Sequence, residues 1–118
     1  MVKIFHLSTC DTCQRIIREL DVPADTVFQD IKTQAISPEQ LDAMKEKAGT
    51  YESLFSRQAR KYREWSLKDK KLSENDYREL ILQEYTFLKR PVIQVDETFF
   101  IGNAPKTVEA AKAKIHGQ

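Results

Sequence analysis

The sequence predicts an α/β protein in which a β-α-β unit, a helical insertion and a β-β-α unit build a four-stranded mixed sheet flanked by helices. Three observations predict this class. Residues 1–31 show a strand pattern, a helical repeat and a second strand pattern. Residues 37–88 carry helical signals, and residues 92–101 show two short strand patterns around a tight turn. With 118 residues and 13.7 kDa, we expect a single domain over residues 1–118, with the helical insertion at about 37–88.

The first unit begins with a strand predicted over Val2–His6, a β-branched and aromatic run. A helix follows, because apolar residues fall at the i, i+3, i+4 and i+7 positions of one helical face counted from Cys13. Val22–Pro23 ends this helix, since the residue before a proline is pushed out of helical conformation. Residues 26–31 predict a second strand, so the unit implies parallel strands joined by a right-handed crossover.

The helical insertion opens with a clear start signal. Ser37 is a good N-cap, Pro38 occupies the first helical position, and Gln40 completes a capping box. Gly49 supplies the C-terminal stop of this helix. Residues 50–72 predict one or two short helices with a basic stretch.

A further helix is predicted from the start signal Ser73-Glu74-Asn75-Asp76, and its buried side is expected to carry Tyr77, Leu80, Ile81 and Tyr85. Two strands follow, at residues 92–95 and 98–101, with Asp96-Glu97 as the turn of a tight hairpin. The last helix starts at Gly102-Asn103-Ala104-Pro105. Its apolar positions include Val108, Ala111 and Ile115.

The composition narrows the class of function. Hydrophobic residues make up 41% and charged residues 31%, which permits a packed core and excludes a disordered chain. The net charge of +1 argues against a general nucleic-acid or membrane-surface binder, because such proteins normally show a large basic excess. We therefore expect no direct nucleic-acid binding and no membrane association. The N-terminus has no apolar stretch of signal-peptide length, so we expect a cytoplasmic protein, and we expect a monomer.

The two cysteines stand two residues apart, in Cys10-Asp11-Thr12-Cys13. A Cys-x-x-Cys pair between a first strand and a first helix favours thiol redox chemistry. Cys10 falls at the predicted helix N-terminus, where unpaired N–H groups and the helix dipole favour a thiolate. Cys13 falls on the buried helical face. We therefore expect Cys10 to attack as the nucleophile and Cys13 to resolve the product through an internal disulfide.

Two other interpretations of the cysteine pair stay open. A zinc site needs two more ligands, and His6 and His116 do not offer the usual second pair, so we expect no bound metal. Two inert, buried cysteines at this spacing are the second alternative.

Four features together resemble the arsenate reductase (ArsC)/Spx family over essentially the whole chain. They are the strand running into Cys10-Asp11-Thr12-Cys13, the helical insertion, Leu88-Lys89-Arg90-Pro91-Val92-Ile93 and Phe99-Phe100-Ile101-Gly102. The resemblance implies a thioredoxin-like fold and Cys10 as the catalytic or sensing cysteine. It also implies that Arg90 and a cis-proline, Pro91, face this cysteine.

In the arsenate-reducing members three arginines surround the cysteine and hold the oxyanion. Arg57 resembles the first and Arg90 the second, and guanidinium groups suit a tetrahedral oxyanion because they offer paired donors. Arg57 also lies in a basic run that fits a solvated face. The third position falls in Asn103-Ala104-Pro105, which contains no arginine. Cys13 stands where the glutaredoxin-coupled members generally carry serine, and Gln14 replaces their arginine.

The resemblance implies two functions. The first is a cytoplasmic thiol-disulfide oxidoreductase of the arsenate reductase family, with no bound cofactor and with glutathione, glutaredoxin or thioredoxin as reductant. The second is an Spx-like redox-sensing transcriptional regulator that binds RNA polymerase. The Cys-x-x-Cys pair favours the regulator, and a chain that stops at Gln118, directly after the last helix, favours the enzyme. We take the enzyme as the expectation.

Overall fold

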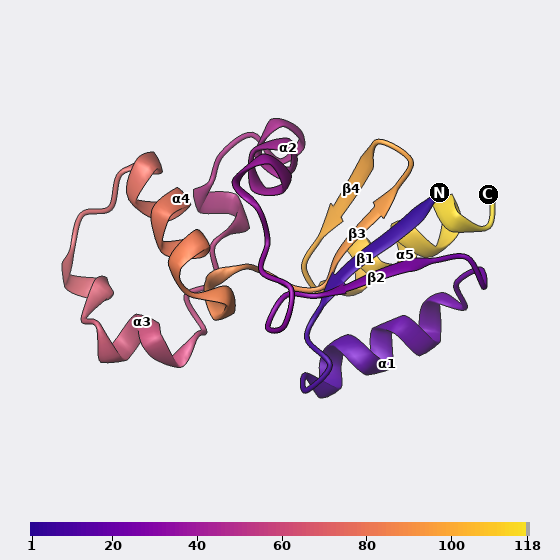
Figure 1. Ribbon diagram of the computed structural model, residues 1–118, viewed down its shortest axis with the longest axis horizontal. Coiled ribbons are helices and arrows are strands. Elements are labelled where there is room, and N and C mark those ends of the chain that lie inside the picture. Colours follow the sequence, from indigo (N-terminus) through magenta and orange to yellow (C-terminus); the bar gives the residue numbers. More distant parts are fainter. Residues whose placement is uncertain (118) are drawn as a thin grey trace. The chain divides into compact units, whose positions relative to one another are not determined.

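The computed structural model describes residues 1–117, and Gln118, the last residue of the predicted domain, lies outside them. The helices and strands follow the predicted order (Figure 1). The described chain divides into two compact units, residues 1–34 with residues 90–117, and residues 35–89. The second unit corresponds to the predicted helical insertion. That both units form one domain stays a prediction.

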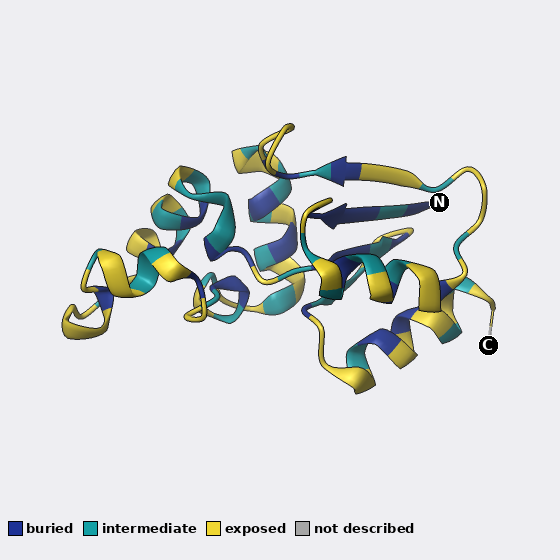
Figure 2. Ribbon diagram, turned by 90° about the horizontal axis from the view of Figure 1, so that it is seen from below, coloured by how far each residue is buried: buried dark blue, intermediate teal, exposed yellow. Residues whose placement is uncertain are grey.

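The first unit is built on a four-stranded mixed sheet, as predicted. The strands are β1 (Val2–His6), β2 (Val27–Asp30), β3 (Val92–Val95) and β4 (Thr98–Ile101), in the order β2-β1-β3-β4. β1 pairs parallel to β2 and antiparallel to β3, and β3 pairs antiparallel to β4. β1 is therefore an inner strand, and Figure 2 shows it buried along most of its length from the N-terminus.

Two helices, α1 (Asp11–Leu20) and α5 (Pro105–Ile115), pack on one face of this sheet. Strand side chains alternate between faces, so Val2 and Ile4 point to the same side as the paired Val95 and Ile93. The core formed there consists of Val2, Ile4, Ile16, Leu20, Ile93, Val95, Val108 and Ala111. The predicted apolar faces of both helices are thus the faces that build the core.

The second unit contains short helices and 3₁₀ turns. They are α2 (Pro38–Ala48), η1 (Glu52–Leu54), α3 (Arg60–Glu64), η2 (Leu67–Asp69), α4 (Glu74–Gln83) and η3 (Tyr85–Phe87). The predicted capping box of α2 is present: the Gln40 N–H donates to Ser37 Oγ at 3.1 Å, and the Ser37 N–H donates to Gln40 Oε1 at 3.0 Å. α4 starts with the same device, because Ser73 and Asp76 exchange equivalent bonds. Local sequence signals therefore predicted the starts of α2 and α4 correctly.

The end of α4 differs from the prediction. Tyr77 and Ile81 are buried as expected, but Leu80 is only half-buried and the helix ends at Gln83. Glu84 has extended backbone, and its carboxylate accepts hydrogen bonds from the backbone N–H and the hydroxyl of Thr86 at 3.2 and 2.9 Å. This local bonding favours a new turn over a further helical turn. Tyr85 consequently lies in η3, half-buried, and not on the buried side of α4.

An ion pair joins α2 to α4 inside the second unit. Arg78 donates from Nε and Nη2 to the two oxygens of Asp42 at 2.9 and 3.2 Å, and the Tyr51 hydroxyl donates to Asp42 Oδ1 at 2.6 Å. The hydrogen bonds from Arg78 first, and then from Tyr51, lower the pKa of Asp42 to about 2. The carboxylate is thus held ionised between the two helices.

No helix within residues 1–117 is long and apolar enough to cross a membrane.

Candidate active site

Cys10 stands at the N-cap of α1, with extended backbone at φ −95° and ψ 111°. Its N–H donates to the Leu7 carbonyl at 3.1 Å, and its carbonyl accepts the Gln14 N–H at 3.1 Å. The side chain therefore sits at the end of a helix where unpaired N–H groups attract negative charge. Cys10 is half-buried and Cys13, one turn further along, is fully buried; both are free thiols.

The surroundings of Cys10 favour its thiolate. Partial burial by itself raises the pKa of Cys10. Hydrogen bonds from the backbone N–H and the thiol of Cys13 act against it, and so do the charge and the hydrogen bond of Arg90; together these four contributions outweigh burial. The net result is a Cys10 pKa below that of an ordinary cysteine.

The surroundings of Cys13 favour the neutral thiol. Burial is the main cause that raises the pKa of Cys13, to about 11, and the negative charge of the Cys10 thiolate adds to it. The Leu7 backbone N–H and the charge of Arg90 act in the opposite direction but do not compensate. The two thiols thus differ: the pKa of Cys10 is lowered and the pKa of Cys13 is raised.

Arg90 and Pro91 join this site from the segment that leads into β3. The Arg90–Pro91 peptide bond is cis, as predicted, and the Pro91 carbonyl accepts the Gly102 N–H at 3.0 Å. The effect of Arg90 on the pKa values of both cysteines places its cation beside the thiol pair. The structure therefore brings together Cys10, Cys13 and Arg90, which the sequence analysis singled out separately.

Arg57 belongs to the second unit, between η1 and α3. Its Nη2 donates to Glu52 Oε2 at 2.7 Å and to the Tyr77 hydroxyl at 3.0 Å, and its guanidinium lies over the Tyr77 ring, 5.7 Å from the centroid. The hydrogen bond from Arg57 to Glu52 is the main cause that raises the pKa of Arg57. No pattern in the sequence marks Glu52 or Tyr77 as a partner of Arg57. A role for Arg57 in oxyanion binding stays a prediction.

Gln14 is a residue near the thiols to which the sequence analysis assigned no role. Its side-chain Nε2 donates to the Leu7 carbonyl at 3.0 Å and lies 3.3 Å from Nδ1 of His6. His6 is buried in β1. The signal in the sequence was the position of Gln14 in the first turn of the helix, four residues after Cys10.

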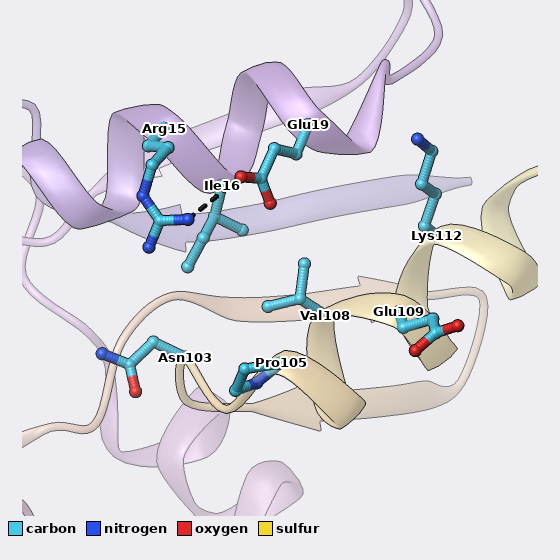
Figure 3. A pocket seen from close by; sticks show the side chains of 8 residues that line it. All are labelled: Arg15, Ile16, Glu19, Asn103, Pro105, Val108, Glu109 and Lys112. Atoms are coloured by element: carbon cyan, nitrogen blue, oxygen red, sulfur yellow. Dashed lines mark hydrogen bonds and ion pairs between the residues drawn. The ribbon is translucent and has the colours of Figure 1, made fainter.

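A groove of about 340 Å³ runs between α1 and α5 (Figure 3). Ile16 and Val108 lie at its apolar floor, and its charged rim includes Arg15, Glu19 and Lys112. Arg15 donates from Nη1 to Glu19 at 3.0 Å. Asn103 also lines this groove; it belongs to the segment in which the arsenate-reducing members carry their third oxyanion-binding arginine. Cys10 and Cys13 are not among the residues that line the groove.

Within residues 1–117, no three side chains of the His, Cys, Asp and Glu types come together as a group that could hold a metal ion.

A comparison with models of protein families matches residues 5–111 to the ArsC family. The chain belongs to the ArsC family. The family supports thiol-based oxidoreductase chemistry, and the thioredoxin-like fold predicted for the chain is confirmed. A comparison with curated proteins gives no match.

Solved structures agree with this assignment. An arsenate reductase (ArsC) related protein from Brucella melitensis is 28% identical, with a TM-score of 0.70 and 92% of each chain covered. A possible arsenate reductase from Streptococcus mutans is 27% identical, with a TM-score of 0.72, covering 92% of this chain and 98% of that one. Arsenate reductase from Vibrio cholerae shares the fold at 17% identity, with a TM-score of 0.78. The match covers 93% of this chain and 96% of the Vibrio cholerae chain.

Proposed function

We propose that this protein is a thiol-disulfide oxidoreductase of the arsenate reductase type, with Cys10 as the nucleophile and Cys13 as the resolving thiol. The observation that carries the proposal is the placement of the two thiols, with Cys10 half-buried at the N-cap of α1 and Cys13 fully buried one turn further along. In keeping with this placement, the Cys10 pKa is lowered and the Cys13 pKa is raised to about 11. A dithiol that works in sequence needs one sulfur ionised first and the other protonated until it is needed.

The proposed reaction with arsenate has two chemical steps. The Cys10 thiolate attacks arsenic and forms an S–As bond, while one arsenate oxygen leaves as water after protonation. Cys13 then loses its proton and attacks Cys10 Sγ, and the S–As bond breaks with its electron pair going to arsenic. Arsenite leaves, so arsenic is reduced by two electrons and the two thiols are oxidised to a disulfide. The cation of Arg90 stabilises the Cys10 thiolate and the bound oxyanion.

The electrostatic interaction between the two thiols sets the order of the two reaction steps. The Cys10 charge is one of the causes that raise the pKa of Cys13, after burial. Once Cys10 is bonded to arsenic this charge is gone, so Cys13 ionises more readily. Cys13 thus becomes nucleophilic when its target, the Cys10–arsenic adduct, has formed.

The cycle closes when a thiol reductant returns two electrons to the disulfide. Membership in the ArsC family supports a glutaredoxin- or thioredoxin-type partner, or glutathione, for this step. A cytoplasmic location and a monomeric state remain expectations from the sequence.

The Cys-x-x-Cys pair also favours a second candidate, an Spx-like regulator in which the same disulfide is a redox switch and RNA polymerase is the partner.

One purified sample tests both candidates. Arsenate-dependent NADPH oxidation is measured through a glutathione–glutaredoxin or thioredoxin couple, and capture of RNA polymerase is tested in parallel. We expect turnover in the unmodified protein, its loss in Cys10→Ser, and no capture. Capture without turnover would select the regulator.

A further inference from the structure

The Leu7 carbonyl, at the loop between β1 and α1, receives two hydrogen bonds that concern Cys10. It accepts the backbone N–H of Cys10 at 3.1 Å, and it accepts Gln14 Nε2 at 3.0 Å. One bond holds the main chain of the reactive residue, and the other comes from the first turn of the helix that this residue caps. Gln14 therefore clamps the loop against the helix start from which the Cys10 sulfur projects.

Chemistry fixes the orientation of the Gln14 amide. A carbonyl oxygen only accepts, so the atom facing Leu7 must be the amide nitrogen, which carries two hydrogens. The same nitrogen lies 3.3 Å from His6 Nδ1, and a hydrogen bond between the two requires the ring tautomer in which Nδ1 is the acceptor. Both partners of Gln14 thus belong to adjacent residues at the end of an inner strand.

His6, one of the two partners of Gln14, is held by several contacts of its own. His6 is buried, its ring meets the Phe28 ring edge-on at 5.7 Å and 84°, and its carbonyl accepts the Ile31 N–H at 3.0 Å. The contacts of the Gln14 side chain with His6 and Leu7 therefore fix the first turn of α1 relative to the end of β1.

We propose that Gln14 is a positioning residue for Cys10, acting through the Leu7 carbonyl. The inference rests on the proposed function, in which Cys10 is the nucleophile. Gln14 holds the Cys10 backbone so that its sulfur stays beside the Cys13 N–H and the Arg90 cation, the groups that stabilise the thiolate. Gln14 needs no contact with the reacting sulfur for this role.

Gln14→Leu removes the amide donor at similar side-chain size, and Gln14→Met does so at similar length. Gln94→Leu is the matched control, because Gln94 Nε2 donates to the Asp96 carbonyl at 2.9 Å in the same unit, at the β3–β4 turn. The measurement is the pH dependence of Cys10 alkylation by iodoacetamide, followed by peptide mapping so that Cys13 does not contribute. Thermal unfolding is recorded for every variant.

We expect both Gln14 variants to raise the Cys10 pKa by roughly half a unit to one unit, which lowers the thiolate fraction at neutral pH about three- to tenfold. The Gln94 control should keep the Cys10 profile of the unmodified protein even if it loses as much thermal stability. An unchanged Cys10 profile in both Gln14 variants, or an equal shift in the control, overturns the positioning role and leaves the proposed function intact. An ordinary Cys10 pKa in the unmodified protein overturns both.

Discussion

Replacing Arg90 by lysine and by glutamine separates two contributions of its guanidinium to the thiol site. Burial raises the pKa of Cys10, and the donors on Cys13 and then the charge and hydrogen bond of Arg90 lower it. Lysine keeps the charge but loses the planar pair of donors, whereas glutamine loses the charge. The two variants should therefore affect thiol ionisation and oxyanion turnover to different extents.

For Arg90→Lys we expect a nearly unchanged Cys10 pKa and an arsenate turnover reduced roughly ten- to a hundredfold. A charge-assisted hydrogen bond contributes roughly 1.5–3 kcal/mol, and each ~1.4 kcal/mol is a factor of ten in rate. For Arg90→Gln we expect a larger loss of turnover than for Arg90→Lys, because the charge is lost as well, and a Cys10 pKa higher by about half a unit to one unit. A charge pair at a partly solvated site contributes roughly 1 kcal/mol, and losing the cation disfavours the thiolate.

The assay combines Cys10 alkylation against pH with coupled NADPH oxidation. Arg60→Lys is the control, since Arg60 is an exposed residue at the start of α3 in the basic run, and it should be nearly silent. Equal losses of turnover in Arg60→Lys and Arg90→Lys would mean that the basic run, and not the Arg90–Pro91 segment, holds the oxyanion. An unchanged Cys10 pKa in Arg90→Gln would refute the electrostatic reasoning.

Three further predictions concern the thiols and the second unit. Limited alkylation at neutral pH should label Cys10 well ahead of Cys13, because the raised pKa of Cys13 keeps its thiol protonated. Peptide mapping that finds Cys13 labelled first contradicts the assignment. Mild peroxide should convert the reduced protein to a monomer with an internal Cys10–Cys13 disulfide, seen by mass spectrometry, and a product that is only a crosslinked dimer speaks against it. Asp42 has a pKa lowered to about 2, so its stabilising effect should be present above about pH 4 and be lost as the pH falls towards 2. Urea unfolding should show that Asp42→Asn is less stable than the unmodified protein at neutral pH and that this difference closes in acid; a difference that persists at low pH rules out the charge as its cause.

The elements that the sequence predicted best are those whose signals are local. The capping box between Ser37 and Gln40 needs residues three positions apart, and the β3–β4 hairpin needs one turn between two apolar runs. The end of α4 was missed because the Glu84 carboxylate bonds to Thr86, a side-chain choice that helical periodicity does not encode.

The candidate site was predictable in part. The place of Cys10 at a helix start follows from local pattern, but its approach to Arg90 depends on the pairing of β1 with β3, and only the family resemblance indicated it. The partners of Arg57 come from separate elements of the insertion, and the Gln14 clamp depends on a backbone carbonyl that no sequence pattern marks. Tertiary contacts of this kind require the structure.

A single turnover without reductant tests the division of labour between Cys10 and Cys13 most directly. Fully reduced protein is mixed with arsenate, and arsenite, free thiols and the intact mass are measured on the same sample. We predict one arsenite released and two thiols lost per chain, with the disulfide mapped to Cys10–Cys13, and neither product in Cys10→Ser. Arsenite formed without this internal disulfide, or no arsenite and no loss of thiols from a fully reduced sample, would contradict the account.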